Sequence, residues 1–162
     1  MSELNNNLNK IYKFSGYIAA FFLVLVAAFI LIGIASRIFG FYIRGLAEYS
    51  GYCMAASSFL ALAYTFGEKG HIRINLFLEK SNKSIRRYLE LWCLSIASFF
   101  SGFLSFYFVK MLMISFNFQE RSEGADEILI WIPQVSVALG STIFFICVFH
   151  NFILLILKKD NI

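Results

Sequence analysis

The chain has 162 residues, of which 59% are hydrophobic, 19% aromatic and only 15% charged, and its formal net charge is +4. This composition excludes an ordinary soluble domain, because a chain of this size could not bury so much apolar surface in one core. The positive charge does not require nucleic acid, since basic connections are common beside a membrane.

Four runs without a charged side chain divide the sequence. They cover residues 14–36, 49–67, 91–109 and 128–157. A helix rises about 1.5 Å per residue, so each run reaches about the length needed to cross a hydrocarbon core of about 30 Å. We therefore expect an all-α integral membrane protein, a single membrane domain whose four transmembrane helices lie at about 14–36, 49–67, 91–109 and 133–157.

The first connection, residues 37–48, is apolar and aromatic but also carries Arg37, Arg44 and Glu48. This mixture is too apolar for a loop in water and is typical of a helix that lies at the membrane interface. Arg44 and Glu48 would stand one turn apart on the same face of that helix. The sequence thus predicts a short interfacial amphipathic helix between the first two spans.

The middle connection follows Gly67 and contains Gly70, and glycines at these positions favour the end of a helix and a turn. Apolar residues at positions 74, 77 and 78 predict a second interfacial amphipathic helix. From position 84 the apolar pattern indicates a helix that continues into the third span. Attraction to anionic lipid alone would also explain the basic residues of this connection.

Small residues recur at helical spacing in the third span. Ser95, Ser98, Gly102 and Ser105 follow one another at intervals of three and four residues, so they share one face of a helix. Such a stripe lets two helix backbones approach closely. The second helix could belong to this chain or to another membrane protein, and the pattern alone does not decide between them.

Aromatic residues with a polar tip gather near the ends of the expected spans. They include Tyr49, Tyr52, Tyr88, Trp92 and Trp131. Tyrosine and tryptophan commonly mark the level of the lipid headgroups, so these residues predict interfaces and need no ligand.

The basic residues are distributed unevenly between the two sides of such a protein. Of the 14 lysines and arginines, Arg37, Arg44, Lys110 and Arg121 fall in the first and third connections, and the other ten fall in the termini and the middle connection. Positively charged loops stay in the cytoplasm. We therefore expect both termini and the middle connection to be cytoplasmic.

The expected spans contain almost no group that could couple transport to an ion. None of them holds Asp, Glu, Lys or Arg, and His150 is the one histidine inside a span. Membrane proteins usually keep an ionisable group in hydrocarbon only for a function. Cys53, Cys93 and Cys147 lie singly, without the spacing of a metal site or a redox motif. The sequence therefore predicts neither an enzyme, a cofactor nor a carrier that works alone.

Several positions together resemble a known family, the small membrane subunit of tripartite ATP-independent periplasmic (TRAP) transporters, of the DctQ type. These are Arg37 after the first span, Glu48 before the second, the Gly-His-Ile-Arg-Ile run at 70–74, the Leu-Glu-Lys at 78–80 and Pro133 at the start of the fourth span. The run at 70–74 is the most specific of them, and the resemblance covers most of the chain.

The resemblance implies a function and partners. In this family the small subunit pairs with a large permease subunit that carries the substrate and sodium sites, in the bacterial inner membrane. A soluble periplasmic protein delivers an organic anion of the dicarboxylate or sialic acid type. The small subunit would support and orient the permease, help dock the binding protein and contact membrane lipid.

The same resemblance selects candidate contact residues. Arg37, Arg44, Glu48, His71 and Arg73 would fix the complex at the two membrane faces, and the small-residue stripe adds Ser98 and Gly102 as candidates for a partner interface.

Two alternatives remain at this stage. The chain could be a four-span scaffold or assembly factor for a different membrane protein. It could also be a redox subunit in which His71 and His150, both near the cytoplasmic face, ligate a b-type haem.

Overall fold

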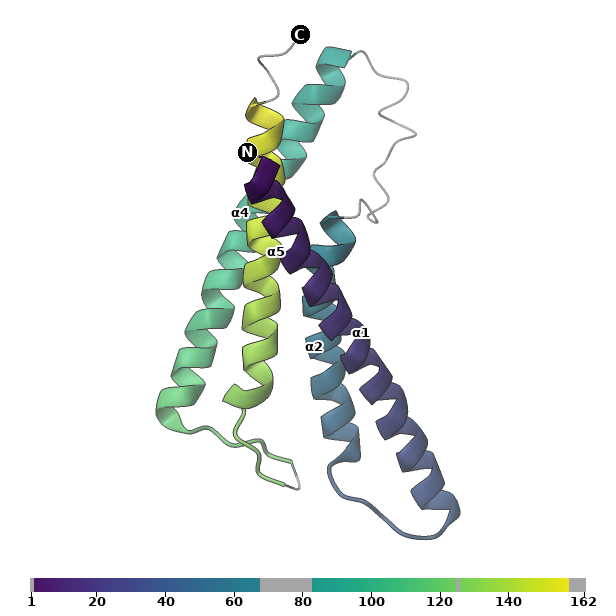
Figure 1. The fold of residues 1–162 in the computed structure, drawn as a ribbon. Coiled ribbons are helices and arrows are strands. Elements are labelled where there is room, and N and C mark those ends of the chain that lie inside the picture. The colour runs from purple at the N-terminus through teal and green to yellow at the C-terminus, as the bar shows by residue number, and fades with distance from the viewer. Residues whose placement is uncertain (1, 68–82, 125, 158–162) are drawn as a thin grey trace.

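The computed structural model describes residues 2–67, 83–124 and 126–157, with side chains from residue 8 in the first range and residue 87 in the second. Its elements are all helices (Figure 1). They are α1 (Ser2–Ile38), α2 (Leu46–Gly67), α4 (Lys83–Phe118) and α5 (Trp131–Leu157).

Three of these helices are long and apolar enough to cross a membrane. The stretches that qualify are Leu8–Ile38 in α1, Arg87–Phe118 in α4 and Trp131–Leu157 in α5. Helix α2 is not among them, because its tyrosines, serines and Glu48 lower its mean hydropathy. The all-α membrane fold is thus confirmed for three expected spans, and a fourth span in α2 stays a prediction.

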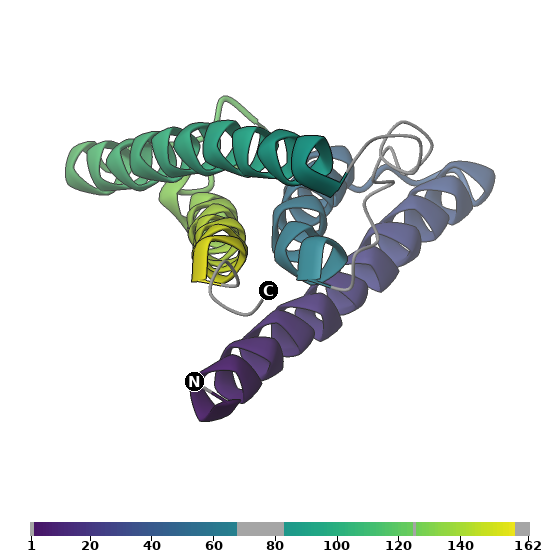
Figure 2. The ribbon, with the colours of Figure 1, turned by 90° about the horizontal axis from the view of Figure 1, so that it is seen from above.

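The helices form a row, in the order α1, α2, α5, α4. Helix α1 packs along α2, α2 packs along α5, and α5 packs along α4, while α1 meets α5 over only a short stretch. Seen from above, α1 and α4 lie on the two outer sides, with α2 and α5 between them (Figure 2). The two outer helices therefore each lack a neighbour on one side within the described part of the chain.

Small residues explain why the middle of the row packs closely. A side chain at Gly140 of α5 would begin 2.6 Å from the carbonyl carbon of Phe59 in α2, so only glycine fits there. Helix association in a bilayer depends on this kind of close packing, because lipid gives no hydrophobic driving force between helices.

Serine hydroxyl groups join neighbouring helices. Between α1 and α2, Ser15 donates to the carbonyl of Leu60 at 2.6 Å, and Ser57 donates to the carbonyl of Ala19 at 2.9 Å. These two pairs show that α1 and α2 run antiparallel. Between α4 and α5, the hydroxyl groups of Ser105 and Thr142 lie 3.0 Å apart.

One buried cluster joins three helices near the N-terminus of α1. Tyr12 of α1, Ala63 of α2 and Cys147 of α5 pack together there. The thiol of Cys147 is close to the carbonyl of Ala63, with an Sγ to O distance of 3.6 Å. Cys147 is therefore a packing residue, as expected from its isolation in the sequence.

The predicted interfacial helix in residues 37–48 is wrong. Helix α1 continues to Ile38, so Arg37 lies in its last turn, and Glu48 lies in the first turn of α2. Between them Gly40 and Gly45 both have a φ of +75°, a left-handed conformation that glycine adopts readily and that interrupts a helix. The second predicted interfacial helix, at 74–80, lies outside the described residues.

Lys110 does not lie in the third connection, where its charge suggested a helix boundary. Helix α4 continues through Lys110 to Phe118, because the intervening residues are mostly apolar and include no glycine or proline. The candidate span Arg87–Phe118 is thus longer than the expected span at 91–109, and its additional residues include Arg87, Glu90 and Lys110.

The close contact at Gly140 generates a stability prediction. Gly140→Ala should lower the free energy of unfolding by about 1 to 3 kcal/mol, the usual cost of forcing an extra group into a packed contact. Thermal unfolding of the detergent-purified chain, followed by circular dichroism, measures this.

Gly51→Ala is the matched control. Gly51 also lies within a helix, but a side chain there would meet no atom within 4 Å. Alanine has the higher helix propensity, so this variant should be neutral or slightly more stable. Equal destabilisation by both substitutions would contradict the assignment of Gly140 to the α2–α5 contact.

Candidate functional site

The two described connections lie at the same end of the molecule, which we name the connection end. It comprises the α1–α2 connection, residues 39–45, the α4–α5 connection, residues 119–130, and the first turns of α2. Figure 1 shows both connections at the end opposite the first turns of α1 and the last turns of α5. Three of the seven residues that the sequence predicted as partner contacts lie in or beside the connection end: Arg37 in the last turn of α1, Arg44 and Glu48.

Glu48 links α2 to the α4–α5 connection. Its half-buried side chain lies in the first turn of α2, and its carboxylate lies directly over Gly124, at the place that a side chain of residue 124 would occupy. Glycine at 124 is therefore what allows the carboxylate to approach the backbone of the connection.

Two tyrosines of α2 extend this link. The hydroxyl of Tyr49 donates to Oδ2 of Asp126 at 2.8 Å, and the hydroxyl groups of Tyr52 and Ser122 lie 2.9 Å apart. We name these contacts, together with Glu48 over Gly124, the seam. The seam joins α2 to a segment that follows it by about seventy residues.

The α4–α5 connection is ordered by its own backbone. The amide of Ser122 donates to the carbonyl of Ile128 at 2.7 Å, and the amide of Ile130 donates to that of Glu120 at 3.0 Å. The carboxylate of Glu120 also accepts a hydrogen bond of 2.6 Å from Ser115 in α4. These bonds close the connection on itself, so the seam holds a defined segment.

Charges of both signs are exposed at the connection end. Arg121 and Glu127 form an ion pair at 3.5 Å, which contributes little stability because both side chains are mostly exposed. Arg37 and Arg44 are exposed and have no acidic partner among the described residues. Their guanidinium groups are free to bind a carboxylate on another molecule.

The structure brings three of the predicted contact residues to one end. Arg37 and Arg44 flank the α1–α2 connection, and Glu48 takes part in the seam. His71 and Arg73 lie outside the described residues, so their role stays a prediction.

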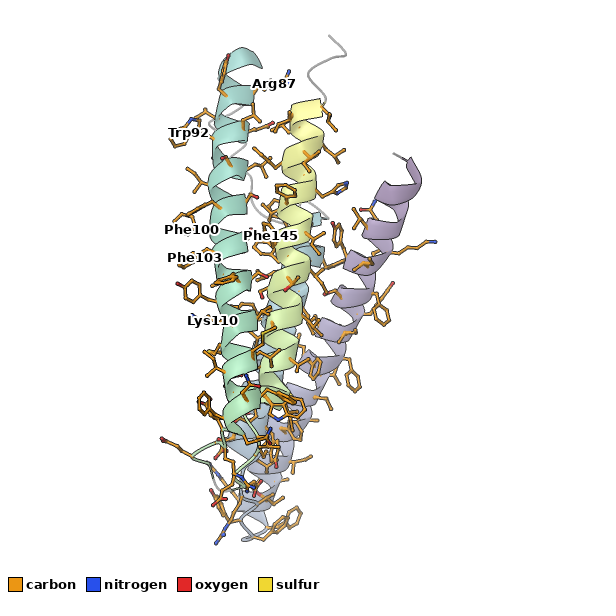
Figure 3. The ribbon with its side chains drawn as sticks, turned by 90° about the vertical axis from the view of Figure 1, so that its left-hand side faces the viewer. Arg87, Trp92, Phe100, Phe103, Lys110 and Phe145 are labelled. Carbon is orange, nitrogen blue, oxygen red and sulfur yellow. The ribbon has the colours of Figure 1, made fainter. Side chains whose placement is uncertain are left out.

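The part of the small-residue stripe that holds Gly102 and Ser105 lies against α5, whereas Ser95 is exposed. A side chain at Gly102 would begin 2.9 Å from the ring of Phe145, and Ser98 accepts a hydrogen bond from Ser101 through its carbonyl. Figure 3 shows Phe145 on α5 beside α4. Packing within the chain accounts for Gly102, and a partner contact at Ser98 or Gly102 stays a prediction.

No metal or haem site is evident where the structure is described. Residues 8–67, 87–124 and 126–157 contain no cluster of three histidine, cysteine or acidic side chains that could hold a metal ion. His150 lies half-buried in α5, and the other proposed haem ligand, His71, lies outside the described residues.

The seam was not predicted from the sequence. Tyr49 and Tyr52 were expected in an aromatic belt, and no pattern singled out their partners Ser122 and Asp126. No pattern within a single sequence shows that two segments so far apart are in contact. The one available signal was the clustering of two tyrosines beside Glu48 within the first two turns of α2.

The seam generates a prediction about local stability. Tyr49→Phe combined with Tyr52→Phe removes both hydroxyl contacts, and each exposed hydrogen bond is worth about 0.5 to 1.5 kcal/mol. We expect the two losses together to lower the free energy of local opening of residues 119–130 by about 1.4 kcal/mol. Amide hydrogen exchange in this segment should then become about tenfold faster, because exchange requires this opening.

Tyr42→Phe is the control for this experiment. Tyr42 lies in the α1–α2 connection and is highly exposed. Exchange in residues 119–130 should be unchanged in this variant. Unchanged exchange in the double variant as well would show that the seam does not hold the connection.

A family of known proteins matches most of this chain. Residues 26–158 match the family model described as tripartite ATP-independent periplasmic transporters, DctQ component. A search of curated proteins finds no significant match. The family match covers α2, α4, α5 and part of α1, and it confirms the resemblance inferred from the motifs. The chain therefore belongs to the DctQ component family of TRAP transporters.

Proposed function

We propose that this chain is the small permease subunit of a sodium-coupled TRAP transporter for organic anions. It supports and orients a large permease subunit and helps to dock a periplasmic binding protein. The family match is the observation that carries the proposal. The substrate class and the sodium coupling are inferred from the resemblance and belong to the partner proteins.

The open row of helices supports a role as a partner subunit. In the most apolar window of α1 only 6% of the residues are buried, and in those of α4 and α5 the shares are 17% and 22%. A helix that buries so little within its own chain offers its remaining surface to lipid or to another membrane protein. A large permease subunit would cover part of this surface.

The chemistry of the helices supports the same division of labour. The described apolar stretches contain no cluster of acidic side chains that could bind a cation. Ion-coupled carriers place such groups within the membrane. We therefore assign ion coupling to the permease partner.

We also propose that α2 is a fourth span. It lies alongside the apolar part of α1, because the ring of Tyr49 contacts that of Phe29 at 6.1 Å and Gly67 lies beside Tyr12. If α1 crosses the bilayer, α2 occupies the same depth. The hydroxyl groups of Ser58 and Thr65 donate to backbone carbonyls of α2, which lowers the cost of placing them in lipid.

With four spans, the connection end faces the periplasm and both termini face the cytoplasm. The distribution of lysine and arginine supports this orientation, because most of them fall in the termini and the middle connection. At the periplasmic side, Arg37, Arg44 and the segment held by the seam would be the groups that meet the permease or the binding protein.

The orientation predicts the outcome of reporter fusions. Alkaline phosphatase, which is active only in the periplasm, should be active when fused after Glu123 and inactive when fused after Asn82. Green fluorescent protein, which folds in the cytoplasm, should give the opposite pattern. Phosphatase activity at Asn82 with none at Glu123 would reverse the orientation.

Reconstitution tests the proposed function itself. The chain alone in liposomes should transport no organic anion, because it lacks an ion site. Liposomes that also contain the permease subunit encoded beside it, with the cognate binding protein outside, should take up a radiolabelled dicarboxylate or sialic acid when a sodium gradient is applied.

Two omissions serve as controls for this uptake. Permease and binding protein without this chain should show no uptake, and the complete system without a sodium gradient should show none either. Full uptake without this chain would remove its proposed role. Sodium-dependent flux from this chain alone would contradict the division of labour.

A further inference from the structure

Lys110 is a charged residue within the long, otherwise uncharged part of α4. It is the one Lys, Arg, Asp or Glu between residues 91 and 118. The side chain is exposed, and its ammonium group lies 6.0 Å from the ring centroid of Tyr107, one turn away on the same helix. No acidic side chain pairs with it among the described residues. A lone lysine in such a helix is stable in a membrane where its ammonium group reaches the surface or an anion from outside the chain.

The position of Lys110 along α4 matches the edge of a bilayer. It follows Trp92 by 18 residues, which is five turns of helix, so the two residues share one face. Five turns span about 27 Å, close to the thickness of a hydrocarbon core. Tryptophan prefers the headgroup level. If Trp92 marks one edge of the core, Lys110 marks the other.

The surface between these two residues is apolar and aromatic. Figure 3 shows Trp92, Phe100, Phe103 and Lys110 along the length of α4. The exposed side chains of this surface are Phe99, Phe100, Phe103, Phe106 and Tyr107. The opposite face of α4 carries Ser101, Gly102 and Ser105 and is occupied by α5. We name the exposed surface from Trp92 to Lys110 the aromatic face.

We propose that the aromatic face lies against lipid, and that Lys110 binds the phosphate of an anionic phospholipid in the leaflet nearer the α4–α5 connection. A phospholipid brings negative charge to the depth that Lys110 occupies, and its acyl chains cover the aromatic rings. The lysine stem is long and flexible, so its ammonium group reaches the phosphate while its methylene groups stay in the apolar layer.

Lipid explains this surface better than a protein partner does. A partner helix would have to place its own carboxylate at the edge of the hydrocarbon to pair with Lys110, whereas every phospholipid supplies a phosphate there. A phospholipid with a net negative charge is preferred, because the phosphate of phosphatidylcholine is already neutralised by its own choline group.

The proposal fixes how far α4 extends beyond the membrane. Eight residues follow Lys110 in α4, which corresponds to about 12 Å of helix. The end of α4 and the seam would then lie in or above the headgroup layer. The permease would contact the faces of the row that the aromatic face leaves free.

Fluorescence quenching by brominated lipid tests the proposal. The chain carries one bimane label at Met113→Cys, on the exposed face one turn beyond Lys110, with the native cysteines replaced by alanine. It is assembled with the unlabelled permease subunit in nanodiscs of phosphatidylcholine and phosphatidylglycerol. In parallel samples one lipid or the other carries bromine near its headgroup.

We expect brominated phosphatidylglycerol to occupy the site about twofold to fivefold more than its mole fraction. Fivefold corresponds to about 1 kcal/mol, the attraction expected for one basic side chain near an anionic lipid surface. Lys110→Gln should abolish the preference, and Lys110→Arg should retain it. Co-purification of each variant with the permease shows that the complex is intact.

A label at Phe99→Cys is the matched control. Phe99 lies on the same aromatic face, seven residues after Trp92 and eleven before Lys110. No charged residue lies beside it on this face. Either lipid should quench it in proportion to its mole fraction. Absence of quenching at both labels would show that protein covers the face and would overturn the proposal. Equal quenching by both lipids at Met113→Cys would overturn the headgroup site.

Discussion

The contact between α2 and α5 holds the structure together, because every other helix reaches the row through one of these two. Helix α1 is held by α2, and α4 is held by α5. The contact depends on the absence of a side chain at Gly140, which lies against the backbone of Phe59. In a bilayer this closeness matters more than in water, since exclusion of water contributes nothing between two helices in lipid.

The seam is a second contact between the α1–α2 half and the α4–α5 half of the chain, and it is polar, whereas the first contact is close backbone packing. It consists of polar groups at the connection end, where Glu48 and Tyr49 of α2 meet Gly124 and Asp126. Such hydrogen bonds would compete with water at a membrane surface, so each contributes modestly. Their main effect is to fix the orientation of α2 relative to the α4–α5 connection. Together with the Gly140 contact they fix α2 to the α4–α5 pair at two levels, and two fixed levels prevent the halves from rotating about each other.

The sequence predicted the helices well but not their arrangement. Runs of uncharged residues locate helices because an unpaired backbone amide in lipid is costly and a helix satisfies all of its amides internally. The same rule failed at Lys110, since a single lysine can stay in a helix when its ammonium group reaches the membrane surface. The interfacial helix predicted at residues 37–48 rested on a different pattern, a mixture of apolar and charged residues, and it is absent because Gly40 and Gly45 interrupt the helix there. Apolar periodicity indicates which face of a helix would lie against lipid or protein, but it does not show whether the backbone remains helical through the segment.

The seam and the row could not be read from the sequence for a different reason. Tyr49 and Asp126 lie far apart in the chain, and each has an adequate local explanation on its own. The small-residue stripe of α4 was likewise consistent with contact inside the chain or outside it, and the ring of Phe145 beside Gly102 shows that α5 occupies part of it. This leaves a thin molecule with helix surface on both sides of the row. A closed bundle of four helices would satisfy its packing internally, whereas this row leaves helix surface uncovered on both sides and holds its α4–α5 connection through the seam.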